Sequence, residues 1–331
     1  MLEAVQVIGS AAEAEYAALR TGAVAIDRSH RARWRLAGTK AAETLTGLVT
    51  NDVLALASGQ GQYAALLTPK GKIIADVTIY RVADGLVIDV PSRAAAGFAE
   101  TIRKYVNPRV AAYTDESATT TDVGAYGIRA AAIVAQALGL TPDALSALAP
   151  HAHLAATGGI VTRVPTLGLD GFAVLAPATE RDALWQRLLA AGAVAGSTAV
   201  WDVARVEAGR PEWGIDIDET TIPQEAGFDE FGAISYTKGC YTGQETVARI
   251  HFRGHVNRHL RGIRMADDAH PPVTALMDHA GKAVGDVRST VRSPRLGAIA
   301  LAMLRREVEI GATILAGETP VTVTSLPFPG V

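Results

Sequence analysis

The chain has 331 residues, of which 49% are hydrophobic and 20% are charged, so disorder as its main state is excluded and two hydrophobic cores are expected. The formal charge of −3 excludes the strongly basic balance of a dedicated nucleic-acid binder, and we expect no strong nucleic-acid binding. The single cysteine, Cys240, excludes an internal disulfide and any iron–sulfur cluster that the chain could ligate with several thiolates of its own.

The first third of the chain predicts two helices, three strands and a further helix. Apolar residues recur at helical spacing in the helices and dominate the strands. Asp84-Gly85 lies between the last two strands and predicts a tight hairpin, because such a turn needs a positive φ. Ser92 is a suitable N-cap for the last helix. In chain order, these elements are expected at Ala11–Arg20, Thr39–Val49, Tyr63–Thr68, Lys72–Val82, Leu86–Val90 and Ser92–Tyr105.

The turn and strand-end residues of this region recur 86 residues later. Asp84-Gly85 is matched by Asp170-Gly171, and Pro91 is matched by Pro177 at the same offset. A chance coincidence of common turn residues is the alternative to a structural duplication. The duplication predicts two related α+β halves that face each other.

The second copy predicts a further helix. Thr179 and Asp182 have the spacing of a capping box at its start, and Gly192 is suited to its end. In the rest of this region, helices are expected at Gly127–Leu138, after Thr141-Pro142 and at Thr198–Ala208, a connector at His151–Gly159, and a structured loop that wraps a site at Pro211–Thr237.

The last quarter of the chain has short strands separated by turns, which predicts a small antiparallel barrel or sandwich. Pro271-Pro272 and Ser293-Pro294 break the strand pattern. We place a domain boundary near Gly254, so that residues 1–253 contain the two α+β halves and residues 254–331 form the C-terminal domain. Its strands are expected at Leu260–Arg264, Thr274–Met277, Val284–Ser289, Ala298–Leu304 and Val321–Ser325.

The sequence shows no membrane or export signal. Met1–Ala14 contains Glu3 and Glu13 and lacks the basic start of a secretory signal. The most apolar stretches, Ala130–Leu140 and Leu188–Val200, are shorter than the roughly 18 residues that a membrane span needs. We therefore expect a soluble, cytoplasmic protein.

The octet Lys238–Glu245 is a candidate site. Two glycines flank the only thiol of the chain, and Lys238 lies two residues before Cys240. A nearby cation and exposed backbone amides would lower the pKa of the thiol and favour the reactive thiolate. The alternative is that Cys240 is a small buried hydrophobe, as lone cysteines often are.

Two carboxylates are candidates for a second site. Asp76 lies inside the apolar strand Lys72–Val82, where a buried charge without a partner would be costly, so it either points to solvent or serves a site. Glu207 lies at the end of a predicted helix, close in sequence to Arg205 and Arg210. The alternative for Glu207 is a surface ion pair.

Histidine and arginine alternate after the octet. His251, His255 and His259 recur every fourth residue, which on one continuous helix would align them as metal ligands. Gly254 argues against that helix, and we expect no metal site. A solvated or anion-facing strand is the preferred interpretation, and it could contact phosphate or a polyglutamate tail. The arginines of this run are Arg249, Arg253, Arg258 and Arg261.

The octet Lys238–Glu245 resembles the signature of the YgfZ family, the folate-binding proteins related to the aminomethyltransferase (T-protein, GcvT) of the glycine cleavage system. The resemblance extends in order over Leu48–Val53, Gly71–Tyr80, Arg205–Gly209 and Val284–Ala302. The family fold implies a ring of three parts, two related α+β domains and a C-terminal antiparallel β-barrel. They surround a central channel that binds tetrahydrofolate.

The resemblance also implies site residues. In the aminomethyltransferases, an aspartate by the folate takes part in proton transfer, and Asp76 matches it, although the preceding residue, usually also Asp, is Ala75 here. Glu207 matches the glutamate that recognises the pterin, whose N–H and amino group a carboxylate can accept as a pair. Lys238 and Arg249 are further candidates for contacts with the folate.

The two branches of this family differ at Cys240. The aminomethyltransferases resemble Asp-Phe-x-Gly-Lys/Arg-Glu where this chain has Cys240–Glu245, which favours YgfZ. The resemblance then implies a tetrahydrofolate-dependent role in assembling or repairing iron–sulfur clusters in client enzymes, including those that modify tRNA, similar to the mitochondrial Iba-type proteins. Iron–sulfur assembly proteins and client enzymes would be the partners. Cys240 and Asp76 are the candidate catalytic residues.

Two alternatives stay open. The first is an enzyme, a folate-dependent aminomethyl or one-carbon transferase of the glycine cleavage T-protein type. The second is a binding module without chemistry, in which the folate site is vestigial and the basic segment Arg249–Arg264 binds RNA or a protein.

Overall fold

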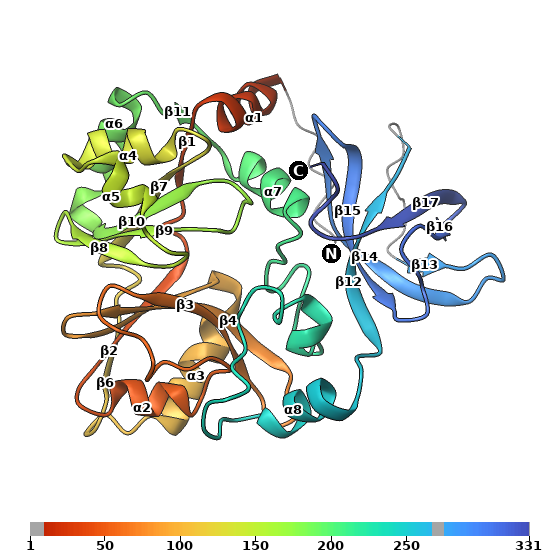
Figure 1. Cartoon of the computed structure of the whole chain (residues 1–331), viewed down its shortest axis with the longest axis horizontal. Helices are drawn as coiled ribbons and strands as arrows, with labels where there is room; N and C mark the ends of the chain where they lie inside the picture. Colours follow the sequence, from red (N-terminus) through yellow and green to blue (C-terminus); the bar gives the residue numbers. More distant parts are fainter. Residues whose placement is uncertain (1–9, 267–274, 331) are drawn as a thin grey trace.

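The computed structural model describes residues 10–266 and 275–330 and has three parts around a central region (Figure 1). Two α+β domains lie one above the other, and a closed C-terminal barrel lies to one side, so the predicted fold class is confirmed. Three segments used in the sequence predictions lie outside the described residues. They are residues 1–9 of Met1–Ala14, Pro271-Pro272, and Thr274, where a strand was expected to begin. Within the described part, no helix is long and apolar enough to cross a bilayer.

The first α+β domain is a five-stranded antiparallel sheet with helices on one face. Its elements are β2 (Ala32–Ala37), α2 (Ala41–Thr46), β3 (Gly61–Leu67), β4 (Ile73–Val82), β5 (Gly85–Val90), the 3₁₀ turn η1 (Ser92–Ala94), α3 (Ala95–Tyr105) and β6 (Ala112–Asp115). The strand order is β3-β4-β5-β2-β6. Because side chains alternate across a strand, Val77 and Ile79 of β4 pack into the core beneath α2 and α3, and the residues between them face the other way.

The second α+β domain is a six-stranded sheet. Its elements are β1 (Val24–Asp27), β7 (Thr120–Tyr126), α4 (Ala130–Leu138), α5 (Pro142–Ser146), β8 (His153–Ala156), β9 (Gly159–Arg163), β10 (Gly171–Pro177), the 3₁₀ turn η2 (Ala178–Glu180), α6 (Arg181–Ala190) and β11 (Val194–Ala195). The strand order is β11-β1-β7-β10-β9-β8, with only β1 and β11 parallel among the described strands. The chain therefore enters the first domain after β1 and returns at β7.

The predicted duplication is confirmed. In the unit of strand, 3₁₀ turn and helix, β10, η2 and α6 each begin 86 residues after β5, η1 and α3. The predicted caps are wrong, however, since neither Ser92 nor Thr179 caps a helix with its side chain. Pro91 and Pro177 instead precede the 3₁₀ turns, with φ of −54° in both, and the regular helix starts only after the turn.

The two sheets face each other, and their helices cover the outer faces (Figure 1). Four side chains form a small apolar cluster between the sheets, Tyr80 and Val87 from the first domain with Ile160 and Leu175 from the second. Other inward-facing positions carry charges, among them Asp76, Asp89 and Asp122, so this seam combines an apolar contact with a polar cleft.

The elements between the domains and the barrel are α1 (Ser10–Thr21), α7 (Thr198–Glu207), the 3₁₀ turn η3 (Pro223–Ala226) and α8 (Gln244–Arg253). Helix α7 lies at the centre of the molecule (Figure 1). Its residues Val200 and Val203 share one core cluster with Leu19 of α1 and with the barrel residues Ile299 and Met303. The same helix therefore packs against the N-terminal helix and the barrel.

The C-terminal part is a closed six-stranded barrel. Its strands are β12 (Arg258–Arg264), β13 (Ala275–Met277), β14 (Ala283–Ser293), β15 (Gly297–Arg305), β16 (Thr313–Ala316) and β17 (Thr319–Thr324). All pairs are antiparallel, in the order β12-β15-β14-β13-β16-β17. Of the predicted barrel or sandwich, the barrel is therefore confirmed. Strand β16 was not predicted. The domain boundary near Gly254 stays a prediction.

Two local predictions are wrong. His151–Gly159 is not a connector, because β8 pairs with β9 through a turn at Thr157-Gly158, where φ is 50° and 71°. The signal was missed because threonine rarely adopts a positive φ. The basic run is not one strand either, since Arg249 and Arg253 lie on α8.

The hairpin between β4 and β5 depends on Gly85. The turn is confirmed, with Val82 opposite Gly85, and the positive φ of 155° is at Gly85. A Cβ atom on Gly85 would lie 2.3 Å from the carbonyl oxygen of Leu36 on the neighbouring strand β2. Only glycine therefore lets β2 and β5 approach at this point.

Replacing Gly85 with alanine should lower the free energy of unfolding by at least about 2 kcal/mol, because φ is strained and the added methyl meets backbone. Gly239→Ala is the matched control, since a Cβ there meets nothing within 4 Å. It should change stability by less than about 0.5 kcal/mol. Equal urea midpoints for Gly85→Ala and the wild type would contradict the close approach.

Candidate functional site

The inward face of β4 carries one of the predicted carboxylates. Asp76, Thr78 and Tyr80 lie on this face and line a cavity between the two sheets. Tyr63 of β3 donates its hydroxyl to Oδ2 of Asp76 at 2.8 Å. Oδ1 of Asp76 is buried and accepts no hydrogen bond from the described residues. A buried acceptor of this kind needs a donor, so it indicates a position for a polar ligand atom.

Asp76 is also poised for proton exchange. Burial and the negative charge of Glu212 raise the pKa of Asp76 to about 6, although Arg31 and the hydrogen bond from Tyr63 lower it. A carboxyl group with this pKa is present in both protonation states near neutral pH. Asp76 can therefore accept a hydrogen bond or take part in proton transfer in the cavity.

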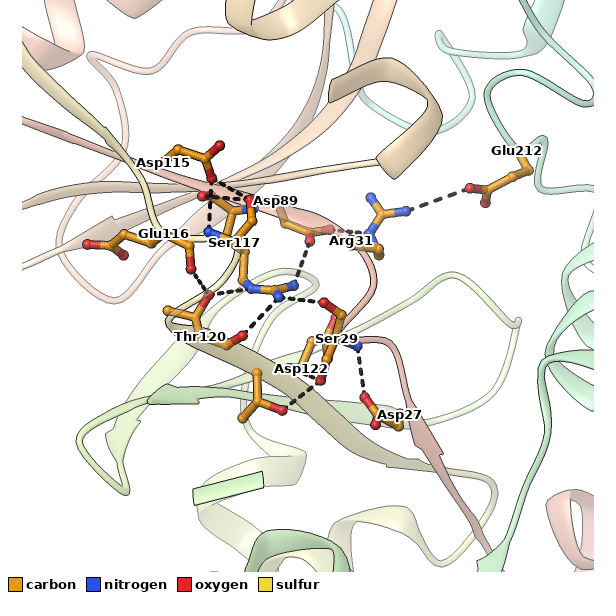
Figure 2. Close-up of polar contacts among 12 residues, drawn as sticks. Asp27, Ser29, Arg31, Asp89, Asp115, Glu116, Ser117, Thr120, Asp122 and Glu212 are labelled. Carbon is orange, nitrogen blue, oxygen red and sulfur yellow. Dashed lines mark hydrogen bonds and ion pairs between the residues drawn. The ribbon is translucent and has the colours of Figure 1, made fainter. Parts of the chain in front are cut away.

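Arg31 lies at the seam between the domains (Figure 2). Its Nε donates to Oδ2 of Asp89 in β5 at 2.6 Å, and its Nη1 lies 3.8 Å from Oε1 of Glu212. Arg33 adds a longer contact of 4.0 Å from its Nη1 to Oδ1 of Asp89. Arg31 therefore has one close carboxylate, Asp89, and one distant carboxylate, Glu212, in the same cavity.

The second domain contributes charges of both signs to this cleft. Asp122 of β7 is buried, and burial raises its pKa to about 6, while Arg28 lowers it and Asp89 raises it. The guanidinium of Arg28 lies over the ring of Trp201, 3.8 Å from its centroid. The cleft thus holds buried carboxylates from both domains, with arginines between them.

A second buried arginine holds the loop after α7 in place. Arg205 donates from Nη1 to Oδ2 of Asp216 at 2.7 Å and from Nη2 to the hydroxyl of Ser289 in β14 at 2.8 Å. Asp216 also accepts from the backbone N–H groups of Ser289 and Glu212, both at 2.9 Å. These bonds tie α7, the loop and the barrel together and direct Glu212 and Arg210 toward the cleft.

Two neighbouring cavities form the centre of the molecule. The cavity at the seam has a volume of about 70 Å³, and a larger cavity of about 350 Å³ lies between the loop, the second domain and the barrel. Both are lined by Pro165, Arg210 and Phe231, so they adjoin. Arg210 stacks over Phe231 at 3.8 Å. Together the two cavities are lined by residues of all three parts of the molecule, and we refer to the pair of cavities as the central channel.

Glu207 does not line either of these cavities. Its side chain is fully buried, and both carboxylate oxygens are used by the protein. Tyr16 and Ser293 donate to Oε1, at 2.7 Å and 2.5 Å, and Arg20 donates to Oε2 at 2.6 Å. The surface ion pair considered for Glu207 is wrong, because this carboxylate joins α1, α7 and the barrel from the inside.

The thiol lies apart from the channel. Cys240 is exposed and lines neither cavity. The alternative of a buried hydrophobe is therefore wrong. Gly243, with φ of 82°, packs against the β3–β4 turn, where a Cβ would lie 2.6 Å from the carbonyl oxygen of Thr68. This glycine of the octet serves backbone packing.

Lys238 anchors the octet on the first domain. Its Nζ donates to the carbonyl oxygens of Thr46, Val49 (2.7 Å) and Asn51 (3.2 Å) at the end of α2 and beyond it. Burial lowers the pKa of Lys238 to about 8. These three acceptors match the three N–H donors of an ammonium group, so Lys238 holds the segment that presents Cys240.

The other predicted polar residues also lie outside the two cavities or apart from one another. Arg249 is exposed on α8 and lines neither cavity. His251 lies on α8, which ends at Arg253, whereas His259 lies on β12, so the histidines are not on one helix. Among the described residues, no group of three or more His, Cys, Asp or Glu side chains is arranged to hold a metal ion.

Several channel residues were not predicted as site residues. Arg31 lines the seam cavity, and Arg33 lies beside it outside the lining. Both alternate with buried Ala32 and Trp34, and cations in such an apolar segment were a signal of the same kind as Asp76. Glu212 gave no signal, because it lies in a loop without periodicity. The predicted loop that wraps a site, Pro211–Thr237, does contribute residues to both cavities.

Comparisons with known proteins agree with this architecture. Residues 5–235 match the GCVT N-terminal domain family, and residues 258–328 match the C-terminal β-barrel domain of CAF17. The chain is 31% identical to an aminomethyltransferase of Rubrobacter xylanophilus over 96% of this chain and 85% of the relative. It is 32% identical to an aminomethyltransferase of Frankia alni over 98% of this chain and 90% of the relative.

A solved structure has the same fold. The crystal structure of the glycine cleavage system aminomethyltransferase T from Bartonella henselae matches with a TM-score of 0.84 and 25% sequence identity. The match covers 96% of this chain and 89% of that chain. The order of the two α+β domains and the barrel is thus shared along almost the whole length.

The buried pair of Arg205 and Asp216 should be essential for stability. Arg205→Met should lower the free energy of unfolding by about 3–5 kcal/mol, because it leaves the Asp216 carboxylate buried without its cation. Arg181→Met is the control, since Arg181 is half exposed and its pair with Asp27 should contribute at most about 1 kcal/mol. Similar urea unfolding curves for the two variants would contradict this role.

Asp76 should make stability depend on pH. Its pKa rises from 3.8 to about 6 on folding, so between these values the folded protein keeps a proton that the unfolded chain loses, and stability falls as the pH rises. Asp76→Asn removes this loss. The free energy of unfolding of Asp76→Asn minus that of the wild type should therefore be about 2–3 kcal/mol larger at pH 7 than at pH 4. A pH-independent difference in urea unfolding would contradict the raised pKa.

Proposed function

Because this chain belongs to the GCVT N-terminal domain family, we propose that it is a YgfZ-type protein. It binds tetrahydrofolate in the central channel and supports the assembly or repair of iron–sulfur clusters in client enzymes, including tRNA-modifying ones. The observation that carries the folate part is the buried Oδ1 of Asp76, which has no donor among the described residues and lies in the channel.

The channel residues fit a reduced folate. A pterin has flat faces and a donor-rich edge, and the seam cavity offers the rings of Tyr63, Tyr80 and Phe231 together with the free oxygen of Asp76. The larger cavity beside it is lined by Arg210 and Arg261, whose charges suit the carboxylates of the folate tail. Asp76 and Tyr63 would hold the pterin, and the two arginines would hold the tail.

Bound tetrahydrofolate would supply a carrier for a one-carbon unit. Asp76 would accept a hydrogen bond from the folate or exchange a proton with it, because its pKa of about 6 allows both states near neutral pH. Tyr63 keeps Oδ2 of Asp76 occupied and thereby directs Oδ1 to the ligand. The buried surroundings exclude bulk water from this carboxyl group.

The iron–sulfur part of the proposal is based on Cys240. This thiol is exposed, as a residue that meets a partner protein must be. A cluster needs several ligands, so iron–sulfur assembly proteins or the client enzyme would complete its coordination. The barrel matches the C-terminal β-barrel domain of CAF17 and not a domain named after the glycine cleavage enzyme. This match supports the same assignment.

A second candidate function is a folate-dependent aminomethyl transferase. It is favoured by the relatives named aminomethyltransferase that align with nearly the whole chain. Turnover with an aminomethylated lipoyl carrier protein separates the two candidates. The replacement of the usual Asp by Ala75 beside Asp76, and the cysteine in the octet, favour the first candidate.

Calorimetric titration with tetrahydrofolate, under reducing and anaerobic conditions, tests the folate part. The wild type should bind saturably, and Asp76→Ala should weaken binding by at least about tenfold, because a hydrogen bond to a charged group is lost. Glu219→Gln, an exposed change in the channel loop, should bind like the wild type. Absence of binding by the wild type would overturn the proposal.

Cys240→Ser tests the iron–sulfur part. Since Cys240 lines neither cavity, the variant should bind tetrahydrofolate as the wild type does. In cells that lack the wild-type protein, it should fail to restore the activity of iron–sulfur enzymes, including tRNA-modifying ones. Full restoration by Cys240→Ser would contradict the role of the thiol.

A further inference from the structure

Glu207, the carboxylate that the family resemblance assigns to the pterin, already accepts hydrogen bonds from the protein itself. Glu207 is fully buried, and Tyr16, Arg20 and Ser293 donate to its two oxygens. Arg20 is the charged partner of Oε2, so releasing this oxygen would leave the carboxylate of Glu207 buried without its cation, at a cost of several kcal/mol. A ligand would have to break these bonds to use Glu207.

A different carboxylate has the opposite properties. Glu212 lines the seam cavity, its side chain is 28% exposed, and its carboxylate accepts no hydrogen bond from the described residues. Its nearest cation, Arg31, lies at 3.8 Å and is held closer by Asp89 at 2.6 Å. Figure 2 shows Arg31 between these two carboxylates. Glu212 is therefore free to bind a donor.

The backbone of Glu212 is nevertheless rigid. Its N–H donates to Asp216 at 2.9 Å, and its carbonyl oxygen accepts from the N–H groups of Ile215 and Asp216 at 3.2 Å and 2.9 Å. Asp216 in turn is bound by the buried Arg205. A fixed backbone with an unused carboxylate is the arrangement of a preorganised binding residue.

Glu212 and Asp76 border the same cavity. Both residues line the seam cavity together with Tyr63, and the charge of Glu212 raises the pKa of Asp76 and of Tyr63. Arginines also line this cavity, but Arg31, the cation nearest to Glu212, is paired more closely with Asp89, so Oδ1 of Asp76 and the carboxylate of Glu212 keep acceptor capacity. A ligand that uses this capacity presents N–H groups, as the amide and amino edge of a pterin does.

We propose that Glu212, and not Glu207, is the second carboxylate that binds the donor edge of the pterin, opposite Asp76. Glu207 is a structural residue that joins α1, α7 and the barrel. This inference rests on the proposed folate binding and specifies which residue of this chain recognises the ring. It also makes Glu212 a specificity-determining residue for 2-amino pterins.

Calorimetric titration of the full chain with tetrahydrofolate tests this assignment. Glu212→Gln should weaken binding by about 30-fold, because a bidentate, charge-assisted pair is lost. Its thermal unfolding midpoint should equal that of the wild type. Glu207→Gln should lower the unfolding midpoint and, at a temperature where it is folded, bind within threefold of the wild type. Glu219→Gln is the matched control for a charge change in the same loop.

A ligand analogue tests contact with the donor edge directly. When a methyl group replaces the 2-amino group of the pterin, the wild type should lose about 30-fold in affinity. Glu212→Gln should bind the analogue and tetrahydrofolate within about threefold of each other, since the partner of the amino group is already changed.

Each result decides between the two carboxylates. Wild-type affinity in Glu212→Gln, or a loss of affinity in folded Glu207→Gln, would overturn this inference while leaving folate binding intact. Equal discrimination against the analogue by the wild type and Glu212→Gln would also overturn it. No binding of tetrahydrofolate by the wild type would overturn the proposed function and this inference together.

Discussion

The buried guanidinium of Arg31 is the constraint on which the seam between the two α+β domains depends. A buried charge must be paired, and Asp89 of β5 supplies the pair at 2.6 Å. Arg31 lies just after β1, where the chain crosses from the second sheet to the first. The pair therefore holds the crossing point against the first sheet. Because Arg31 is paired most closely with Asp89, it neutralises the charges of Asp76 and Glu212 less.

The second buried arginine extends this arrangement to the barrel. Arg205 joins α7 to the loop through Asp216 and to β14 through Ser289. The loop is thereby fixed where it passes the seam, with Glu212 on one cavity and Arg210 between the two cavities. The channel is a consequence of these two arginines, since they position its charged lining.

The channel and the thiol are separate features of the molecule. Lys238 fixes the octet on the carbonyl groups at the end of α2, and Gly243 packs it against the β3–β4 turn, so Cys240 is presented to the outside. A ligand in the channel and a partner at Cys240 would therefore be bound by different faces of the first domain. Any coupling between them would pass through that domain, because β4 carries Asp76 and the turn before β4 contacts the octet.

The sequence by itself determined the features that depend on neighbouring residues. Alternation in β4 placed Asp76 among apolar residues, Asp84-Gly85 marked the hairpin, and the 86-residue offset revealed the duplicated unit. Only the tertiary structure decided which carboxylates are free. Glu207 is occupied by Tyr16, 191 positions away, whereas Glu212 is left open because Asp89 holds Arg31. Local patterns report the preferences of a segment, but whether a buried charge is paired depends on segments that only the folded chain brings together.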